Sequence, residues 1–294
     1  MRIDSHQHYW HYDPVRDGWI TNEMGVLKRD YLPSDLRPGL RSAGIDASVT
    51  VQVDQSERET EYLVDLAAQD DSIAGVVGWV DLRGPEIDRR LEYFSRFPAL
   101  RGFRHIAQSE PDDRFLAGEA FVRGVSALKR FQFTYDILIY PKQLPAAVNL
   151  VEKLPDQAFV LDHIAKPLMK AREMDTWASG IRALAANPNV FCKISGLITE
   201  ADWSHWRADD FKPYLDVVFD AFGVERLMYG SDWPVCLLAG SYAQVYELAA
   251  GYVRERCEGE VEKIFGGNAV RFYGLKAKAP GSYQRGSYQH GSGS

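Results

Sequence analysis

Two histidines near the start of the chain, His6 and His8, are the first residues whose type and spacing could do chemistry. They follow Ile3 in a short run that reads as a buried β-strand, and they stand two residues apart. Because side chains alternate between the faces of a strand, both imidazoles project from the same face. Two imidazoles side by side at a strand end can ligate a cation or jointly polarise one oxygen atom.

The elements that must position these histidines follow a regular alternation along the chain. After the strand around Ile3, further apolar strands are expected over residues 47–53, 73–80, 100–106, 133–138, 159–164, 190–196 and 227–232, each followed by a helical pattern. Near-continuous apolar strands are typical of a parallel sheet that is covered on both faces. The count of eight favours an α/β fold with a single (β/α)8 barrel over an open doubly wound sheet, whose G-x-G-x-x-G loop is absent from the sequence.

The domain organisation follows from the same pattern. We predict one barrel domain over residues 1–275. The remaining stretch, 276–294, is rich in Gly, Ser, Gln and Tyr and is interpreted as a flexible extension or an expression remnant.

Composition limits the class of partner. The chain has 294 residues, 46% of them hydrophobic, and a net charge of -7, which argues against nucleic acid or an anionic membrane as a partner. No stretch approaches the 18 apolar residues of a membrane span. The three cysteines are odd in number and lack C-x-x-C spacing, which indicates free thiols in a reducing compartment. We expect a cytoplasmic enzyme that acts on a small molecule.

Ionisable residues at the carboxyl ends of the strands are the candidates for an active site, because that end carries the site in barrels of this type. Seven such residues are His6, His8, Arg104, His105, His163, Glu200 and Asp232. Arg104 and His105 are neighbours, so only one of them can face the barrel interior. Lys166 and Lys193 are as consistent with solvation or ion pairing as with substrate binding.

Each candidate also has a purely structural interpretation. His163 could be a hydrogen-bonded histidine at the rim, and Asp232 could cap a turn or the next helix. Glu200 could be a surface acid. Among the aromatic residues, Trp10 and Trp233 are the better candidates for the rim.

Three motifs taken together are specific: His6-x-His8, Leu-Asp-His163-Ile-Ala-Lys-Pro and Gly-Ser-Asp232-Trp-Pro. With them, the chain resembles the amidohydrolase superfamily, from about residue 2 to 275. Within it, the chain is most similar to the branch of sugar-lactone and 2-pyrone-dicarboxylate lactonases. Further motifs similar to that branch are Asp-Ser-His-Gln-His-Tyr-Trp10, Arg-Gly-Phe-Arg104-His105, Lys193-Ile-Ser-Gly-Leu and Thr-Glu200-Ala.

The resemblance implies a lactonase that opens a sugar aldonolactone, with L-fucono- and L-rhamnono-lactones fitting best. Asp232 would act as general base while His6, His8 and His163 stabilise the developing oxyanion. The sugar hydroxyls would be bound by the remaining rim candidates, which are Arg104 or His105 together with Trp10, Glu200 and Trp233.

The chain departs from the metal-dependent members of this superfamily in its fifth strand. Those members add a histidine or a carboxylated lysine from strands four and five, whereas residues 133–138 offer only Asp136. One divalent cation, Zn²⁺ or Mn²⁺, would then have His6, His8 and Asp232 as ligands. The resemblance implies that some lactonases of the branch work without metal, and a lactone is an activated ester. We therefore favour a metal-independent reaction.

Three rival functions remain open at this point. A metal-dependent decarboxylase of the same superfamily needs a firmly bound cation and an arginine for the carboxylate. A 2-pyrone-dicarboxylate lactonase should place several arginines at the rim, where the sequence offers Arg104 and little else. A sugar-binding or scaffolding barrel without activity would have no need of Asp232 among the histidines.

Overall fold

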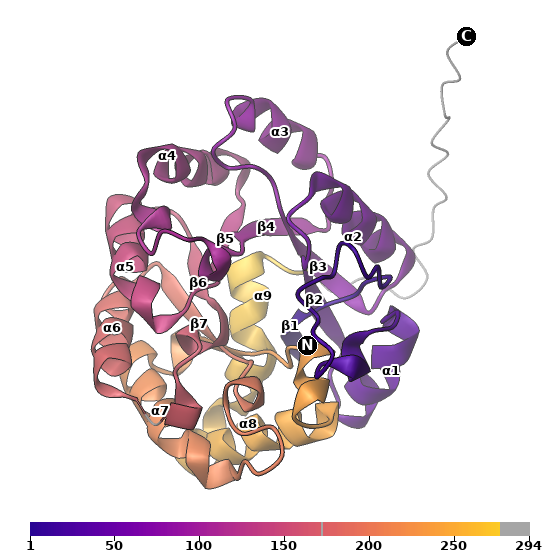
Figure 1. Cartoon of the computed structure of the whole chain (residues 1–294), viewed down its shortest axis with the longest axis vertical. Coiled ribbons are helices and arrows are strands. Elements are labelled where there is room, and N and C mark those ends of the chain that lie inside the picture. The colour runs from indigo at the N-terminus through magenta and orange to yellow at the C-terminus, as the bar shows by residue number, and fades with distance from the viewer. Residues whose placement is uncertain (172, 277–294) are drawn as a thin grey trace.

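The barrel expected from the sequence is present. The computed structural model describes residues 1–171 and 173–276, so all but the first residue of the expected tail over 276–294 lies outside the described residues. Within this part of the chain, eight parallel strands follow one another in sequence order around the molecule (Figure 1). They are β1 (Ile3–Gln7), β2 (Ala47–Val51), β3 (Ile73–Gly78), β4 (Leu100–His105), β5 (Thr134–Ile137), β6 (Phe159–Leu161), β7 (Val190–Ile194) and β8 (Leu227–Tyr229).

Amphipathic helices surround the strands, and the last of them, α9, lies across one end of the barrel. They are α1 (Pro33–Ser42), α2 (Glu57–Gln69), α3 (Ile87–Phe94), α4 (Glu119–Leu128), α5 (Leu144–Lys153), α6 (Asp175–Ala185), α7 (Ala208–Phe222), α8 (Tyr242–Cys257) and α9 (Asn268–Tyr273). Side-chain caps start two of them: Ser56 and Ser241 accept hydrogen bonds from the first turns of α2 and α8. Among the described residues, no helix is both long and apolar enough to span a bilayer.

The last helix, α9, closes the barrel from below. In Figure 1 it lies across the middle of the ring of strands. Its residues Ala269 and Tyr273 pack against side chains of the strands, including Ile3 and Val49. The opposite end of the barrel, at the carboxyl ends of the strands, is the end that bears the site in this fold.

The backbone after β6 differs from the expected strand. The strand was expected to continue through Ile164, but it ends at Leu161, and the four residues from His163 to Lys166 all have positive φ, between 46° and 59°. Such a left-handed turn costs about 1–2 kcal/mol per residue for side chains with a Cβ. Strain of this kind persists where the surrounding structure enforces it, often at functional sites.

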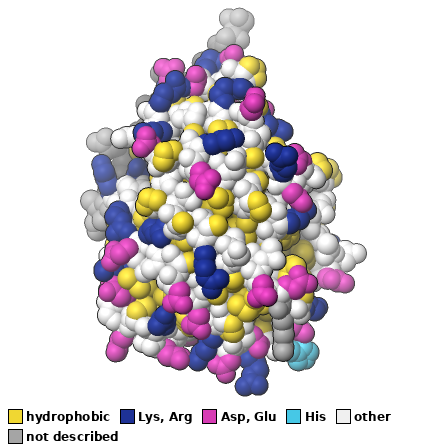
Figure 2. Space-filling model, turned by 90° about the vertical axis from the view of Figure 1, so that its left-hand side faces the viewer, with side chains coloured by type: hydrophobic (Ala, Val, Ile, Leu, Met, Phe, Trp, Pro, Cys, Tyr) yellow, Lys and Arg dark blue, Asp and Glu magenta, His cyan; other side chains and the backbone are white. Residues whose placement is uncertain are grey.

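The surface carries charges of both signs. On the face shown in Figure 2, Lys and Arg side chains are interspersed with Asp and Glu. No continuous basic strip, as phosphate backbones require, crosses this face.

Candidate active site

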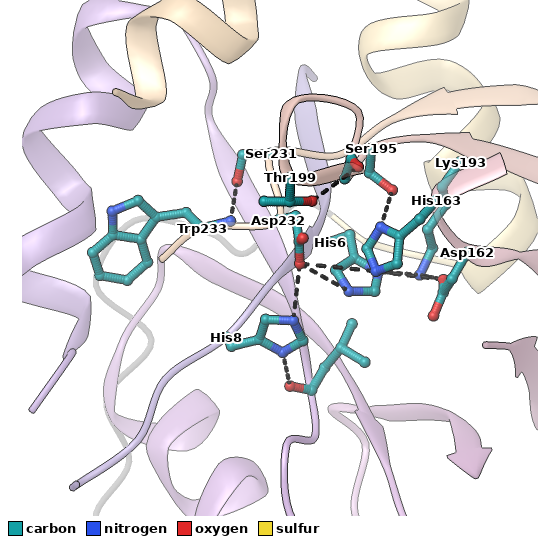
Figure 3. A network of polar contacts seen from close by, with 12 residues as sticks. His6, His8, Asp162, His163, Lys193, Ser195, Thr199, Ser231, Asp232 and Trp233 are labelled. Carbon is teal, nitrogen blue, oxygen red and sulfur yellow. Dashed lines mark hydrogen bonds and ion pairs between the residues drawn. The ribbon is translucent and has the colours of Figure 1, made fainter. Parts of the chain in front are cut away.

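Three imidazoles converge on one oxygen of Asp232 (Figure 3). The distances to Asp232 Oδ1 are 3.2 Å from His8 Nε2, 3.8 Å from His6 Nε2 and 3.8 Å from His163 Nε2. All four side chains are nearly or fully buried. The structure thus brings together the four residues that the sequence predicted to be the catalytic group, from β1 and the residue directly after it and from the segments after β6 and β8.

Backbone contacts between β1 and the segment after β8 hold two sides of this cluster in register. Asp232 N donates to the His6 carbonyl at 2.8 Å, and His8 N donates to the Trp233 carbonyl at 2.7 Å. Gly230 permits the close approach, because a Cβ at this position would lie 2.7 Å from the Cβ of His6.

His163 reaches the cluster through the left-handed turn after β6. Its Nδ1 lies 2.9 Å from the Ser195 hydroxyl at the end of β7. Gly196, with φ of +60°, leaves the space that the ring occupies, because a Cβ there would lie 2.6 Å from His163 Nδ1. Both the turn and the missing side chain are needed to aim this imidazole at Asp232.

The hydrogen bond between His8 and the backbone determines which of the two ring nitrogens of His8 carries the proton. His8 Nδ1 lies 2.7 Å from the Val51 carbonyl oxygen, which can only accept, so Nδ1 is assigned as the donor. In a neutral ring, Nε2 then presents a lone pair to a carboxylate oxygen 3.2 Å away. Two acceptors at this distance need a proton or a cation between them.

The electrostatics keep Asp232 ionised. Burial by itself would raise the pKa of Asp232, but the interactions with His163, His8 and His6 outweigh it and hold the pKa below its ordinary value. Burial lowers the pKa of His163 to about 4 and that of His6 well below its ordinary value. At neutral pH the site therefore combines a carboxylate base with two neutral imidazoles.

A buried network of charges lies beneath the imidazoles. Lys193 Nζ contacts Asp136 Oδ2 at 2.5 Å and Asp162 Oδ1 at 3.0 Å, and Arg104 Nη1 contacts Asp162 Oδ2 at 3.1 Å. Burial opposes ionisation of Asp162, but Lys193, together with His6 and Arg104, holds its pKa well below the ordinary value. Two cations thus balance two carboxylates, as buried charges require.

A cavity of about 220 Å³ opens above the cluster. Asp232, His8, His163 and Arg104 line it. The rest of its wall is mainly apolar and comprises Trp19, Val53, Ile106, Leu138 and Val235, with Lys166, Gln108 and Ser109 as polar members. The volume suits a small molecule of sugar size.

The structure separates Arg104 from His105. Arg104 points into the barrel, where its guanidinium is held by the backbone and side-chain oxygens of Gln52. His105, which was predicted as a substrate-binding candidate, points outward: it accepts from Trp79 Nε1 at 3.3 Å and stacks on Phe115. Alternation along β4 makes these two directions exclusive, so His105 does not reach the cavity.

Two predicted aromatic candidates also lie outside the cavity. Trp10 is buried and donates from Nε1 to the Arg29 carbonyl, which fastens the long segment after β1. Trp233 points away from Asp232 (Figure 3) and packs edge-on against Tyr9 and Tyr31. Both side chains pack next to the site and do not line the cavity.

Glu200 is linked to the cavity by its ion pair with Lys166. Its carboxylate is 3.7 Å from Lys166 Nζ, and both side chains are mostly buried. Burial raises the pKa of Glu200. Lys166, which the sequence left open between solvation, pairing and substrate binding, is thus paired and also lines the cavity.

Three residues at the site were not predicted from the sequence. Trp19 lines the cavity with 42% of its surface exposed, and its only signal was its place in a long segment after the first strand. Gln52 and Ser195 orient Arg104 and His163, respectively. Small polar residues at strand ends are common, so neither gave a signal of its own.

The residues present fit a divalent cation. Among the described residues, two groups of three have ligand atoms within 4.8 Å of one another: His6, His8 and Asp232, and His6, Asp162 and His163. Two imidazoles and a carboxylate are a usual donor set for catalytic zinc. The lone pair of His8 that faces Asp232 is the feature of this structure that a cation would satisfy.

Fold and site together define an enzyme of the amidohydrolase class. Residues 3–275 match the amidohydrolase family, and the chain belongs to it. The resemblance recognised from the sequence motifs is therefore confirmed.

Similar proteins place the chain within that family. It is 43% identical over 290 residues to an L-fucono-1,5-lactonase from Burkholderia multivorans, covering 95% of this chain and 98% of that protein. It is 36% identical to an L-fucono-1,5-lactonase from Burkholderia ambifaria, covering 93% and 95%. A crystal structure of an amidohydrolase from Burkholderia multivorans with bound zinc superposes with a TM-score of 0.90 at 42% identity, covering 94% of this chain and 100% of that one.

Proposed function

We propose that this enzyme hydrolyses a sugar aldonolactone to the aldonic acid. The observation that carries the proposal is the convergence of three imidazole nitrogens on Asp232 Oδ1 at the base of a sugar-sized cavity. The names of the two Burkholderia relatives support L-fucono-1,5-lactone as the first substrate to test. A relative named L-rhamnono-gamma-lactonase, 22% identical over about half of each chain, makes the rhamnono-lactone the second.

In the proposed mechanism, Asp232 is the general base. It accepts a proton from a water molecule as the water oxygen attacks the lactone carbonyl carbon. When the tetrahedral intermediate collapses, the bond to the ring oxygen breaks, and Asp232 returns the proton to that oxygen. A positioned base of this kind contributes about 10²–10⁴ in rate.

The imidazoles and Arg104 stabilise the negative charge that develops on the carbonyl oxygen. His6, His8 and His163 surround the carboxylate within 3.8 Å, and His8, His163 and Arg104 line the cavity. A carbonyl bound beside Asp232 therefore lies next to Arg104 and His163, and His8 can donate to it when its Nε2 carries a proton. A well-placed donor contributes about 3–4 kcal/mol to the stabilisation of such an oxyanion. A cation held by His6, His8 and Asp232 would supply Lewis-acid polarisation of the same oxygen when bound.

The charge of the cavity wall favours a neutral polyol over a dicarboxylate. Among the described residues that line the cavity, Arg104 and Lys166 are the ones with a permanent positive charge. Arg104 is already engaged by Asp162, and Lys166 by Glu200. Neither is left free to hold a pair of substrate carboxylates, as a 2-pyrone-dicarboxylate would require.

The test is a panel of aldonolactones assayed by acid release, with and without a chelator. We expect hydrolysis of L-fucono- or L-rhamnono-lactone that survives chelation, because the residues of the chain supply the base and the donors. Release of acid from none of the lactones would overturn the proposal. Activity that disappears with chelation and returns with zinc or manganese would assign the metal-dependent form of the reaction.

A further inference from the structure

An exposed tryptophan forms part of the cavity wall. Trp19 lines the cavity with 42% of its surface exposed. In the part of the chain that the structure describes, five large hydrophobic side chains are exposed. Trp19 is the aromatic one among them and the one that lines this cavity. Burial of an aromatic surface is favourable, so a ligand that covers the indole gains free energy of binding.

The segment that carries Trp19 is held in place by backbone hydrogen bonds. At its base, Trp10 N donates to the Tyr31 carbonyl at 3.0 Å, and Tyr31 N donates to the Trp10 carbonyl at 2.9 Å. Next to Trp19, Ile20 N donates to the carbonyl of Asp17 at 2.9 Å. The rings of Trp10 and Trp19 pack edge-to-face, with their centroids 6.3 Å apart. These contacts fix the backbone and the ring of Trp19 at the cavity.

The polar part of the cavity wall comes from the opposite side of the barrel. Trp19 belongs to the segment between β1 and β2, whereas Gln108 and Ser109 follow β4 and Lys166 follows β6. The strands are arranged in sequence order, so β4 and β6 lie across the ring from β1. The cavity therefore has an aromatic side and, facing it, a side with hydrogen-bonding groups.

Lys166 has hydrogen-bond donors to spare on this polar side. Its Nζ lies 3.7 Å from Glu200 Oε1, which is longer than a hydrogen bond, and it makes no hydrogen bond to any described residue. An ammonium group has three N–H donors. Gln108 Oε1, an acceptor, likewise has no hydrogen-bond partner among the described residues. Because Glu200 already balances the charge of Lys166, neutral hydroxyl groups are the ligands that match these donors.

We propose that Trp19 and Lys166 bind the sugar ring of the substrate between them. The C–H groups on one face of the ring lie against the indole, whose face carries partial negative charge, and the ring hydroxyls point toward the ammonium. The inference rests on the proposed lactone hydrolysis, because it assigns the residues that recognise the sugar part of the lactone. It goes beyond that proposal in naming two substrate contacts and the orientation of the ring.

The first test uses 1,5-anhydro-L-fucitol, which is the ring of L-fucono-1,5-lactone with a methylene group in place of the carbonyl and cannot be hydrolysed. In ligand-observed proton NMR titrations with wild type, we expect saturable binding and upfield shifts of adjacent ring C–H protons, because protons above an aromatic face are shielded. Trp19→Ala should abolish these shifts and weaken binding about tenfold. Trp19→Phe keeps an aromatic face and should retain part of both effects.

Val26→Ala is the matched control for Trp19. Val26 is a hydrophobic residue of the same segment, is 46% exposed and does not line the cavity. This variant should bind the anhydroalditol with the affinity and the shifts of wild type. Absence of saturable binding by wild type, or unchanged shifts with Trp19→Ala, would overturn the proposal.

A second substitution tests the contact with the hydroxyl groups. Lys166→Met removes the N–H donors and should weaken binding of the anhydroalditol about tenfold or more. The shifts of the bound ring should remain, because the indole is unchanged. Lys170→Met, the same substitution at an exposed lysine of the same segment, is the control and should bind as wild type does. Equal affinity of the two lysine variants would refute the assignment of Lys166.

Lactone hydrolysis distinguishes failure of this inference from failure of the proposed function. With L-fucono-1,5-lactone, Trp19→Ala should raise KM about tenfold and change kcat little, as expected when binding common to the ground and transition states is lost. A wild type that binds the anhydroalditol with the expected shifts but hydrolyses no lactone would refute the proposed reaction and retain the ring-binding site. Lactone hydrolysis with the wild-type KM in Trp19→Ala would refute the ring-binding site and retain the reaction.

Discussion

At the scale of single residues, Asp232 is the side chain on which the proposed chemistry depends most directly. Replacing it with Asn keeps the shape of the side chain, and the N–H of the new amide can donate to the lone pair of His8 Nε2, but the substitution removes the base. We expect kcat to fall by about 10²–10⁴-fold and the melting temperature to change little. Lactone hydrolysis and thermal unfolding of the purified variant measure both quantities.

The matched control for this change is Asp202→Asn, the same substitution at an exposed acid on the segment after β7, whose side chain is 51% exposed. It should retain wild-type turnover. Near-wild-type turnover by the Asp232 variant would remove Asp232 from the role of base.

The buried imidazole of His163 should give the enzyme a measurable acid sensitivity. Burial lowers the pKa of His163 to about 4, below the value near 6.5 of an unfolded chain. The unfolded state therefore binds a proton that the folded state refuses, and stability that is present above about pH 6.5 is lost as the pH falls toward 4. The loss in free energy of unfolding reaches about 3 kcal/mol at the acid end of this window.

Urea unfolding of wild type and His163→Asn between about pH 4.5 and 7, with chelator present, measures this contribution as the difference between the two curves. The variant should lose less stability on acidification. His205→Asn, at a side chain that is 83% exposed, is the control and should follow the wild-type curve. Parallel curves for wild type and His163→Asn would show that the proton uptake lies elsewhere.

The residues at the carboxyl ends of the strands were predictable from the sequence, whereas the ion pairs inside the barrel were not. His6, His8, His163 and Asp232 stand at strand ends in the sequence, and the rules of the fold bring strand ends together. The ion pairs of Lys193 are different, because its partners come from β5 and from the segment after β6. Which side chains meet inside the barrel depends on the relative register of the strands, and the sequence does not display that register.

At the scale of elements, the left-handed turn after β6 determines where His163 points. Its sequence, His-Ile-Ala-Lys, contains no glycine, and the β-branched Ile164 suggested a continuing strand. Positive φ at four consecutive residues is unfavourable locally. It is therefore imposed by tertiary contacts, such as the bond from Trp177 Nε1 to the Ile164 carbonyl at 2.7 Å, and local sequence preference could not reveal it.

Gly196 offers a direct test of this element. A Gly196→Ala substitution adds backbone strain at φ +60° and drives a Cβ to within 2.6 Å of His163 Nδ1. Gly274→Ala adds the same kind of strain at φ +59°, but its Cβ meets nothing within 4 Å. Both variants should lose about 1–2 kcal/mol of stability, and Gly196→Ala should in addition lose most of its turnover.

Chemical unfolding and lactone hydrolysis separate the two effects, because only the first responds to backbone strain alone. Equal turnover by the two variants would mean that His163 does not need the space that Gly196 leaves. The expected difference would assign the turn after β6 and the end of β7 to one unit that aims a single imidazole.

At the scale of the whole molecule, the site lies where the first and last strands meet. Asp4, fully buried in β1, joins the two sides: its Oδ1 accepts from Ser231 N at 2.9 Å and from His6 N at 3.2 Å, and its Oδ2 accepts from Tyr242 OH at 3.2 Å. The order of the eight strands was predictable from the alternation of apolar and helical segments. The carboxylate that fastens β1 to the segment after β8 was not, because Ser231 and Tyr242 lie 227 and 238 residues away in sequence.

Two substitutions test the contact between β1 and the segment after β8. They distinguish its effect on the stability of the barrel from its effect on the positions of His6 and Asp232. Asp4→Ala leaves two backbone N–H groups and a hydroxyl without their acceptor, and should cost at least about 2 kcal/mol of stability. It should also lower turnover, because the residues it fastens adjoin His6 and Asp232.

Ser5→Ala is the control. It breaks the hydrogen bond from Ser5 Oγ to the Tyr229 carbonyl at 2.6 Å and should cost about 1 kcal/mol of stability with turnover retained. Chemical unfolding and lactone hydrolysis, measured on both variants, test these expectations. An active Asp4→Ala enzyme would show that the contact between β1 and the segment after β8 stabilises the barrel without positioning the catalytic residues.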